Sequence, residues 1–184
     1  MSNPDIEVSR VIHGADLLSA FAEFDLFPLE PERWAANIDN GANIGLIARS
    51  IKLGRQAVGT GTLRREGVLP HETAFRETLH GVYQDEETPA FYGLMVSELV
   101  RRHGFGRAIM LAAEKVVIQD PNLPNRIGLT VQTTNKAGRA LYKDLEYKKH
   151  GIIKVENVPV LGDDGVWTPR TVKSVVMSKD LQSE

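Results

Sequence analysis

The sequence predicts a domain of the α/β (α+β) class, and three observations support that prediction. The chain has 184 residues, the usual length of one domain, and a chain of this size can bury a core without disulfides or metals. Apolar residues make up 42% of it and charged residues 25%, as in ordinary globular proteins. Along the chain, short β-prone apolar runs alternate with stretches that have helical spacing.

The first half of the chain predicts, in order, a strand, two helices and two more strands: 6–12, 16–25, 31–38, 44–53 and 56–65. Asp16 is a residue type that favours a helix N-cap. Pro31 is suited to the first turn of the second helix. Gly54 and Arg55 form a tight turn between the two strands, so this pair is predicted to be a hairpin.

The second half begins with a polar, insertion-like segment, 66–89, in which residues 72–80 could form a short helix. After it the pattern predicts a strand, a helix, a strand, a helix and two final strands: 90–100, 107–119, 127–132, a helix from Asn135, 148–158 and 171–177. In the helix from Asn135, a core-facing stripe is expected at Ala137, Leu141 and Leu145.

Composition excludes several classes of function. The chain has no cysteine, which excludes disulfides, thiolate zinc sites, iron–sulfur clusters and a cysteine nucleophile. The net charge of −2 gives no sign of nucleic acid or an anionic membrane as a partner, and the histidines have no metal-ligand spacing. The N-terminal residues lack a basic start and an apolar signal stretch, so a cytoplasmic location is expected.

A glycine turn lies between the strand at 90–100 and the next helix. It reads Arg101-x-x-Gly104-x-Gly106, and glycines at such a turn let successive N–H groups approach an anion at a helix N-terminus. Arg102, His103 and Arg107 add positive charge. The turn therefore predicts a phosphate site, although a simple strand–helix connector would have the same appearance.

Two familiar phosphate sites do not match this turn. The dinucleotide-binding fingerprint requires a third glycine, and Ile109 stands at its position. The lysine that completes a Walker phosphate loop is also missing from the turn.

Two motifs together resemble the GNAT acetyltransferases. Leu94-Met95-Val96 followed by Arg101-x-x-Gly104-x-Gly106 resembles motif A of that family, and residues 135–147 resemble its motif B, Asn-x-x-Ala-x-x-Leu-Tyr-x-x-x-Gly-Phe. Both motifs stand in the family's order and spacing. One residue departs from the pattern: Glu146 occupies the usual glycine position, and we expect it to alter a helix C-cap.

The resemblance implies the GNAT fold, a mixed central β-sheet of about six to seven strands flanked by about four helices. It further implies a single N-acetyltransferase domain over residues 1–184. In this family acetyl-CoA lies in a V-shaped gap between the fourth and fifth strands.

Transferred to this sequence, the resemblance implies a set of acetyl-CoA-binding residues: Leu94, Met95, Val96, Arg101, Arg102, His103, Gly104, Phe105, Gly106, Arg107, Asn135 and Tyr142. The pyrophosphate is expected on the backbone amides from His103 to Arg107, and the pantetheine beside residues 94–96 and Asn135. The Val96 N–H is expected to hold the thioester carbonyl oxygen. No metal is expected.

The resemblance also suggests catalytic residues. Tyr142 is the expected proton donor to the leaving thiolate, and it projects from nearly the same helix face as Asn135, seven residues earlier. A tyrosine packed into the core is the alternative. Glu98 is the candidate general base because it would share the face of Val96 if the strand continues.

Other groups could take the role of base. Glu72, Glu77 and His80 of the polar segment could face the acceptor, and a chain of water molecules could replace them all. Trp34 more simply closes the core, but the family often uses its first helices to wall the acceptor site.

The leading hypothesis is thus an acetyl-CoA-dependent N-acetyltransferase in which a primary amine attacks directly. A GNAT-fold module that senses acyl-CoA without catalysis is the alternative, and an unrelated nucleotide-binding domain is a third. The acceptor would be a small-molecule or peptide amine; acidic residues at 85–87 hint at a cationic one. A homodimer through the C-terminal strands is expected by analogy.

Overall fold

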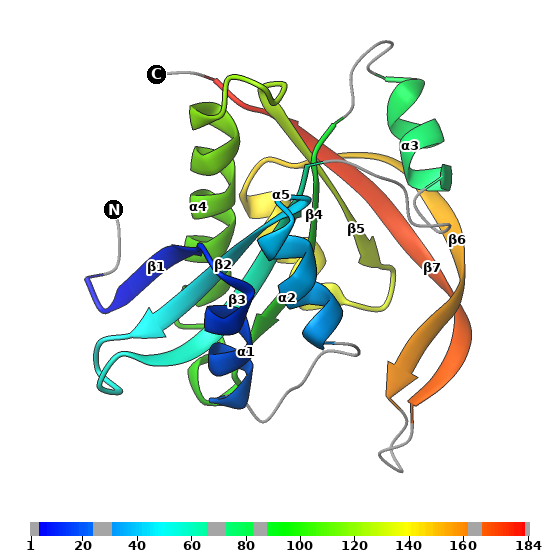
Figure 1. The fold of residues 1–184 in the computed structure, drawn as a ribbon. Helices are drawn as coiled ribbons and strands as arrows, with labels where there is room; N and C mark the ends of the chain where they lie inside the picture. Colours follow the sequence, from blue (N-terminus) through cyan, green and yellow to red (C-terminus); the bar gives the residue numbers. More distant parts are fainter. Residues whose placement is uncertain (1–3, 24–30, 66–72, 83–87, 162–166, 183–184) are drawn as a thin grey trace.

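The protein is described by a computed structural model covering residues 4–23, 31–65, 73–82, 88–161 and 167–182. Its centre is a seven-stranded twisted sheet with strand order β1-β2-β3-β4-β5-β7-β6 (Figure 1). The strands are β1 Ile6–Val11, β2 Asn43–Ser50, β3 Gln56–Arg64, β4 Ala90–Val96, β5 Arg126–Gln132, β6 Lys148–Leu161 and β7 Trp167–Asp180. Every pairing is antiparallel except that of β4 with β5. The sheet is therefore mixed, as expected.

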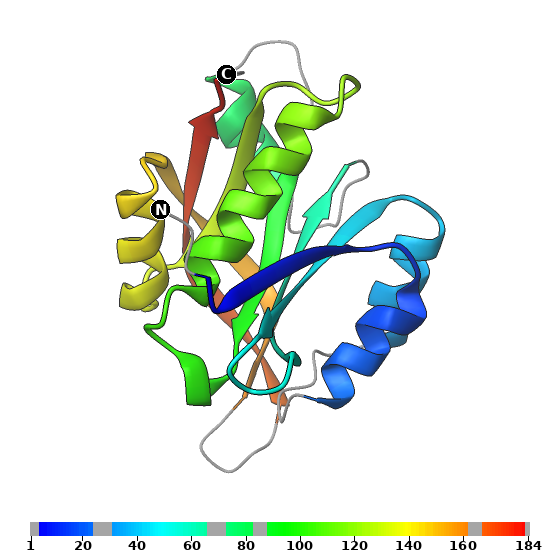
Figure 2. The same ribbon diagram turned by 90° about the vertical axis from the view of Figure 1, so that its left-hand side faces the viewer.

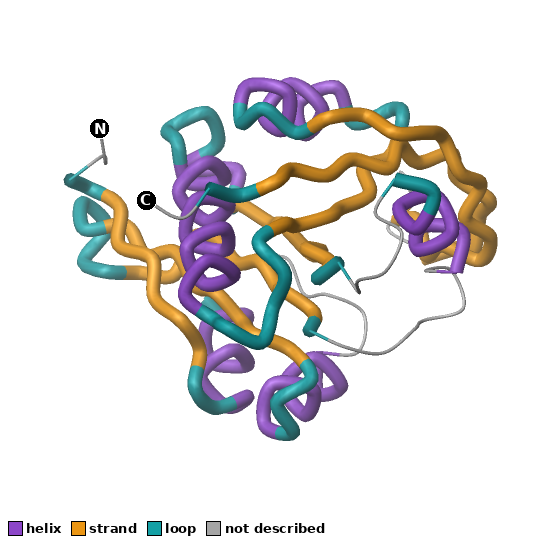
Figure 3. Tube along the Cα trace, turned by 90° about the horizontal axis from the view of Figure 1, so that it is seen from above, coloured by secondary structure: helices purple, strands orange, loops and turns teal. Residues whose placement is uncertain are grey.

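Helices cover both faces of this sheet (Figures 2 and 3). They are α1 Gly14–Ala22, α2 Pro31–Asp39, α3 Thr73–His80, α4 Phe105–Gln119 and α5 Lys136–Asp144. The main core lies between α4, α5 and one face, where Ile109 and Met110 pack against Ile127 and Leu129. Two smaller cores lie on the other face, one under α1 and α2 and one under α3.

Side chains alternate between the two faces of the sheet along each strand, so one strand contributes to the cores on both sides. In β5, Ile127, Leu129 and Val131 point into the main core. The residues between them point toward the face that α3 covers: Phe75 and Leu79 of α3 lie against Gly128. Because the side-chain period of a strand is two, the same strand contributes to both layers.

The elements agree with the sequence pattern in order and type, but several boundaries differ: the last strand, predicted over 171–177, is Trp167–Asp180. The helix predicted from Asp16 begins at Gly14, with His13 at its N-cap. The strand predicted to reach Leu53 ends at Ser50, and residues 51–55 form the turn, with φ of 66° at both Gly54 and Arg55. The strand predicted over 90–100 ends at Val96 and is followed by a 3-10 helix, Glu98–Val100.

The predicted stripe of α5 is also partly wrong. Ala137 is exposed, whereas Tyr142 and Leu145 are buried against the main core and Leu141 packs at its edge. Among the helices of the described residues, none is both long and apolar enough to cross a membrane.

Candidate active site

The two central parallel strands separate soon after they begin. β4 and β5 pair only at Ala90 with Gly128 and at Phe91 with Leu129. Past these pairs the strands diverge, which leaves the β5 side of Tyr92 to Val96 without a partner strand. The V-shaped gap expected from the resemblance is therefore present between the fourth and fifth strands of the described chain.

A bulge in β4 lies at this point of divergence. Between the β3 pairings of Tyr92 and Met95, two residues of β4, Gly93 and Leu94, oppose one residue of β3. Gly93 has a φ of 64°, and a Cβ there would lie 2.3 Å from Cη2 of Trp34. Only glycine fits both the backbone angle and the packed indole, so the bulge depends on this residue.

The bulge also sets which way the following side chains point. Leu94 and Val96 pack at the edge of the main core, near Gly106 of α4. Met95 instead joins the core under α1 and α2, on the opposite face. Of the three residues predicted beside the pantetheine, Leu94 and Val96 share one face and Met95 lies on the other.

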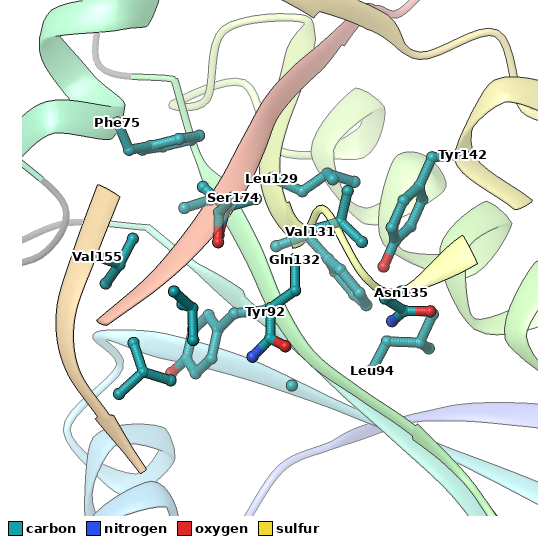
Figure 4. A pocket seen from close by; sticks show the side chains of 16 residues that line it. Phe75, Tyr92, Leu94, Leu129, Val131, Gln132, Asn135, Tyr142, Val155 and Ser174 are labelled. Atoms are coloured by element: carbon teal, nitrogen blue, oxygen red, sulfur yellow. The ribbon is translucent and has the colours of Figure 1, made fainter. Parts of the chain in front are cut away.

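A cavity of about 480 Å³ occupies the gap (Figure 4). Its lining residues are Phe75, Ala90, Phe91, Tyr92, Gly93, Leu94, Leu129, Thr130, Val131, Gln132, Asn135, Tyr142, Val155, Val158, Val172 and Ser174. Leu129 and Val131 belong to the α4 face, and Thr130 and Gln132 to the opposite face, because they alternate along β5. The cavity therefore passes through the sheet.

The cavity has two different ends. One, which we call the α5 end, is formed by Leu94, Asn135 and Tyr142. The other, the hairpin end, contains Phe75 of α3 and Val155 of β6 (Figure 4), and the lining valines Val158 and Val172 pack against the same core cluster. Neutral polar side chains lie between them: Tyr92, Thr130, Gln132 and Ser174.

Tyr142 is fixed at the α5 end by the way α5 terminates. The Tyr147 N–H donates to the Tyr142 carbonyl (2.9 Å) and the Glu146 N–H to the Lys143 carbonyl (3.0 Å), the bond pattern of a Schellman cap. Glu146 takes the left-handed conformation, φ 67°, that glycine usually adopts there. The altered C-cap expected from the sequence is thus a glutamate held in a glycine conformation.

The Tyr142 side chain is buried but borders the cavity. Its ring lies 5.8 Å from that of Tyr147, and its hydroxyl points toward Asn135 and Leu94 (Figure 4). Burial raises the pKa of Tyr142 to about 12. Tyr142 is thus packed into the core, and the same side chain lines the cavity.

Asn135 is the N-cap of α5. Its Oδ1 accepts a hydrogen bond from the Gly138 N–H (2.8 Å), which satisfies one of the free donors of the first turn. The side chain therefore both stabilises α5 and borders the cavity, next to Tyr142 as the helical spacing predicts.

The glycine turn leads from β4 into α4. Arg102 has a φ of 67° and Gly104 a φ of 91°, so the chain bends sharply before the helix. The first helical bond runs from the Ala108 N–H to the Gly104 carbonyl (2.9 Å). The N–H groups of Phe105, Gly106 and Arg107 precede that bond, and such first-turn donors have no acceptor within the helix.

The positive side chains of the glycine turn are exposed, and one of them, Arg101, is bonded within its own loop. Arg101, Arg102, His103 and Arg107 are all exposed. Arg101 is directed back onto its own loop, where it donates to Glu98 Oε1 (2.7 Å) and to the Val96 carbonyl (3.4 Å). The His103 N–H donates to the Val100 carbonyl (3.3 Å), so the amides aimed at an anion begin after this residue.

Glu98 is not brought to the cavity. The strand ends before it, so the alternation that would have placed it on the face of Val96 stops. Its side chain is 77% exposed and pairs with Arg101. Glu77 and His80 are exposed on α3, and Glu72 lies outside the described residues.

The sequence did not predict the hairpin end or Tyr92 as parts of the site. Tyr92 is held by Asn43, whose Nδ2 donates to its hydroxyl (2.6 Å), and by the edge of the Trp34 ring, 5.4 Å away. Trp34 packs on Gly93 and Phe21, on the face of the sheet that α1 and α2 cover. Apolar residues beside a strand edge have no local motif, so only the assembled sheet identifies them.

No three potential metal-ligating side chains gather within the part of the chain that the structure describes.

The comparisons with known proteins agree with this geometry. The model of the acetyltransferase (GNAT) family matches residues 15–147, which include both motifs. The chain belongs to the acetyltransferase (GNAT) family. Among curated proteins, none matches the sequence.

Solved structures share the fold at low sequence identity. The ribosomal-protein-S18-alanine N-acetyltransferase from Escherichia coli is 15% identical with a TM-score of 0.64, and the match covers 97% of this chain and 96% of that one. Arabidopsis thaliana NAA60 in complex with acetyl-CoA is 17% identical, TM-score 0.66, covering 95% and 97%. Spermidine N-acetyltransferase from Vibrio cholerae is 13% identical, TM-score 0.61, covering 96% and 94%.

Proposed function

We propose that the protein transfers an acetyl group from acetyl-CoA to a primary amine by direct attack in a ternary complex. The observation that carries this proposal is the cavity that crosses the sheet between β4 and β5. A donor and an acceptor could enter it from opposite faces and meet in the middle. Membership of the GNAT family supports the donor, and NAA60 is a structural neighbour solved with acetyl-CoA.

The α5 end and the glycine turn offer suitable groups for acetyl-CoA. The N–H groups of Phe105, Gly106 and Arg107 would bind the pyrophosphate, helped by the positive end of the α4 dipole. Arg102 and His103 remain at the rim of the same turn, exposed to solvent. Leu94 and Asn135 would flank the pantetheine.

The backbone of Val96 is suitable for holding the thioester carbonyl. The Ser97 N–H donates to the Val58 carbonyl (2.8 Å), which makes Val96 and Gly59 a non-hydrogen-bonded pair of the ladder. The Val96 N–H therefore points away from β3, toward the gap. One such donor at a developing oxyanion contributes about 3 kcal/mol to transition-state stabilisation.

Tyr142 is the proposed proton donor. Acetyl-CoA supplies an activated acyl group whose thiolate must be protonated as it leaves. With a pKa raised to about 12 by burial, the Tyr142 hydroxyl keeps its proton across the physiological range. It is therefore always available to donate.

We propose that water, rather than Glu98, accepts the proton of the amine. Thr130, Gln132 and Ser174 line the middle of the cavity and can hold water by hydrogen bonds. Glu98→Gln tests the alternative: we expect acceptor turnover to change less than about twofold. A loss of the size usual for a general base, about 100-fold, would restore Glu98 to that role.

The proposed function is tested by measuring free CoA released from acetyl-CoA in the presence and absence of a panel of primary amines. Acceptor-dependent release is the expected result. Tight acetyl-CoA binding without release for any amine would indicate a sensing module instead. Preferential binding of ATP or NAD over CoA would indicate a different nucleotide site.

A further inference from the structure

The hairpin end of the cavity is a packed surface formed by residues far apart in the sequence. α3 lies directly on the sheet because β5 carries a glycine beneath it. A Cβ at Gly128 would lie 2.8 Å from both Phe75 Cζ and Leu79 Cδ1. Phe75 and Leu79 are buried there with Ile153 and Val176, so this packing fixes where the Phe75 ring meets the cavity.

A bulge in β6 turns a second valine toward the cavity. Val155 pairs with Val172 and Val158 with Arg170, so three steps along β6 match two steps along β7. The extra residue shifts the alternation and returns Val158 to the face of Val155. Three valines from two strands thereby line the cavity beside Phe75, in or against the same core cluster.

The described lining of the cavity, including this wall of three valines, carries no charged side chain. All sixteen cavity-lining residues that the structure describes are uncharged. The register places Arg170 next along the β7 row that carries Ser174 and Val172, just beyond the lining. The closest charge along that row is therefore positive, which disfavours a second cationic group on a substrate.

We propose that the hairpin end is the specificity pocket of the acceptor site and selects a primary amine that carries an apolar side group, in preference to a polyamine. This inference rests on the proposed N-acetyltransferase function. An apolar group would displace water from Phe75 and the valines, whereas the second ammonium of a polyamine would lose its hydration without a charged partner among the described lining residues.

Three amines test the proposal in the same assay of CoA release: leucinamide, glycinamide and spermidine. Leucinamide and glycinamide share the amine and the amide and differ by one isobutyl group. We expect kcat/KM for leucinamide to exceed that for glycinamide by at least about tenfold, since even one methylene can contribute that much. Spermidine is expected to be the poorest of the three.

A matched pair of variants locates the selection. Val172→Asp introduces a carboxylate into the pocket, and we expect it to abolish the preference for leucinamide and to raise the relative rate with spermidine. Ile152→Asp introduces the same charge into the same hairpin at a residue that is 55% exposed and outside the lining, and it should keep the wild-type order. If Val172→Asp does not fold, Val172→Thr keeps the volume and adds only a hydroxyl.

The outcomes separate this inference from the proposed function. Equal rates with leucinamide and glycinamide, or spermidine as the best acceptor, would overturn the pocket but leave the acetyltransferase in place. The pocket is also rejected if Val172→Asp and Ile152→Asp change the order of acceptors equally. Acetyl-CoA binding with no CoA release for any amine in a broad panel would overturn both.

Discussion

The two ends of the cavity are built in different ways. The glycine turn, Arg101 to Arg107, and two of the three residues of the α5 end, Asn135 and Tyr142, each come from one contiguous stretch of chain. At the hairpin end, α3, β6 and β7 each contribute one or two apolar side chains. Under the proposed function, the α5 end binds a donor that is the same for every acceptor, whereas the hairpin end can differ with the acceptor. The two ends can therefore be altered separately.

The largest expected effect concerns Tyr142. Tyr142→Phe should lower kcat by about 100-fold or more, because a positioned proton donor contributes that much. Its affinity for acetyl-CoA, measured by calorimetry, should stay within about twofold. Tyr147→Phe is the matched control, since that ring lies 5.8 Å from Tyr142. Equal turnover of the two variants would remove Tyr142 as the acid.

Loss of donor binding should follow from a bulky anion at the glycine turn. Gly106→Glu places a carboxylate among the first-turn amides of α4, and Gly104→Glu places one at the N-cap, two residues earlier. We expect acetyl-CoA affinity to fall by about 100-fold through repulsion and blocked approach. Gly54→Glu is the control for Gly104→Glu, because Gly54 also has positive φ, 66°, but lies in the β2–β3 turn. Unchanged acetyl-CoA affinity in both Gly104→Glu and Gly106→Glu would show that the pyrophosphate binds elsewhere.

The stability of the hairpin end should depend on the packing of α3 against the sheet. Leu79→Ala removes a buried side chain of α3 and should lower the free energy of unfolding by about 2–5 kcal/mol. Leu53→Ala, at a residue that is 44% exposed, should change stability by less than about 0.5 kcal/mol. Below its unfolding temperature, the Leu79→Ala variant should keep acetyl-CoA affinity. A parallel loss of that affinity would show that the two ends are coupled.

A smaller effect is expected at the cap of α5. Glu146 adopts a φ of 67°, which costs a residue other than glycine about 1 kcal/mol. Glu146→Gly should therefore raise the free energy of unfolding by about 1 kcal/mol in urea denaturation, while Lys143→Gly, within the helix, should lower it by a similar amount. Destabilisation by Glu146→Gly would contradict this account of the cap.

The smallest expected effect is that of alkaline pH on the protonation of the Tyr142 hydroxyl. Because burial raises the pKa of Tyr142 to about 12, its hydroxyl stays protonated up to roughly pH 11. With an acceptor of ordinary amine pKa, the rate should rise toward about pH 10 as the amine loses its proton. A fall in kcat between pH 8 and 10 that disappears in Tyr142→Phe would show that the Tyr142 hydroxyl loses its proton at a lower pH than expected.

The sequence predicted the α5 end closely and the hairpin end hardly at all. Gly104, Asn135 and Tyr142 stand in motifs whose spacing reflects a single turn or helix, so local geometry determines their placement. Glu98 was placed wrongly on the strand because nothing in the local alternation shows that β4 ends at Val96. Arg101 was expected at the phosphate, but a nearby carboxylate and carbonyl hold it.

Other differences have the same origin in non-local contacts. The fit of α3 depends on Gly128, about fifty residues away along the chain. The valine wall depends on a one-residue shift in the register of β6. Neither feature leaves a pattern within a window of a few residues, because each depends on what another strand or helix presents.

The sequence by itself determined the family and the order of strands and helices. It also identified the glycine turn and the segment from Asn135 to Tyr142 as candidates for binding acetyl-CoA. These features depend on short contiguous segments of the chain. The sequence also excluded thiol chemistry, because the chain has no cysteine. The tertiary structure alone decided that β4 and β5 diverge into a cavity through the sheet, that Glu98 lies outside it and that apolar residues line its hairpin end. Those features arise where segments far apart in the chain pack together, and side-chain packing between them is a property of the assembled fold.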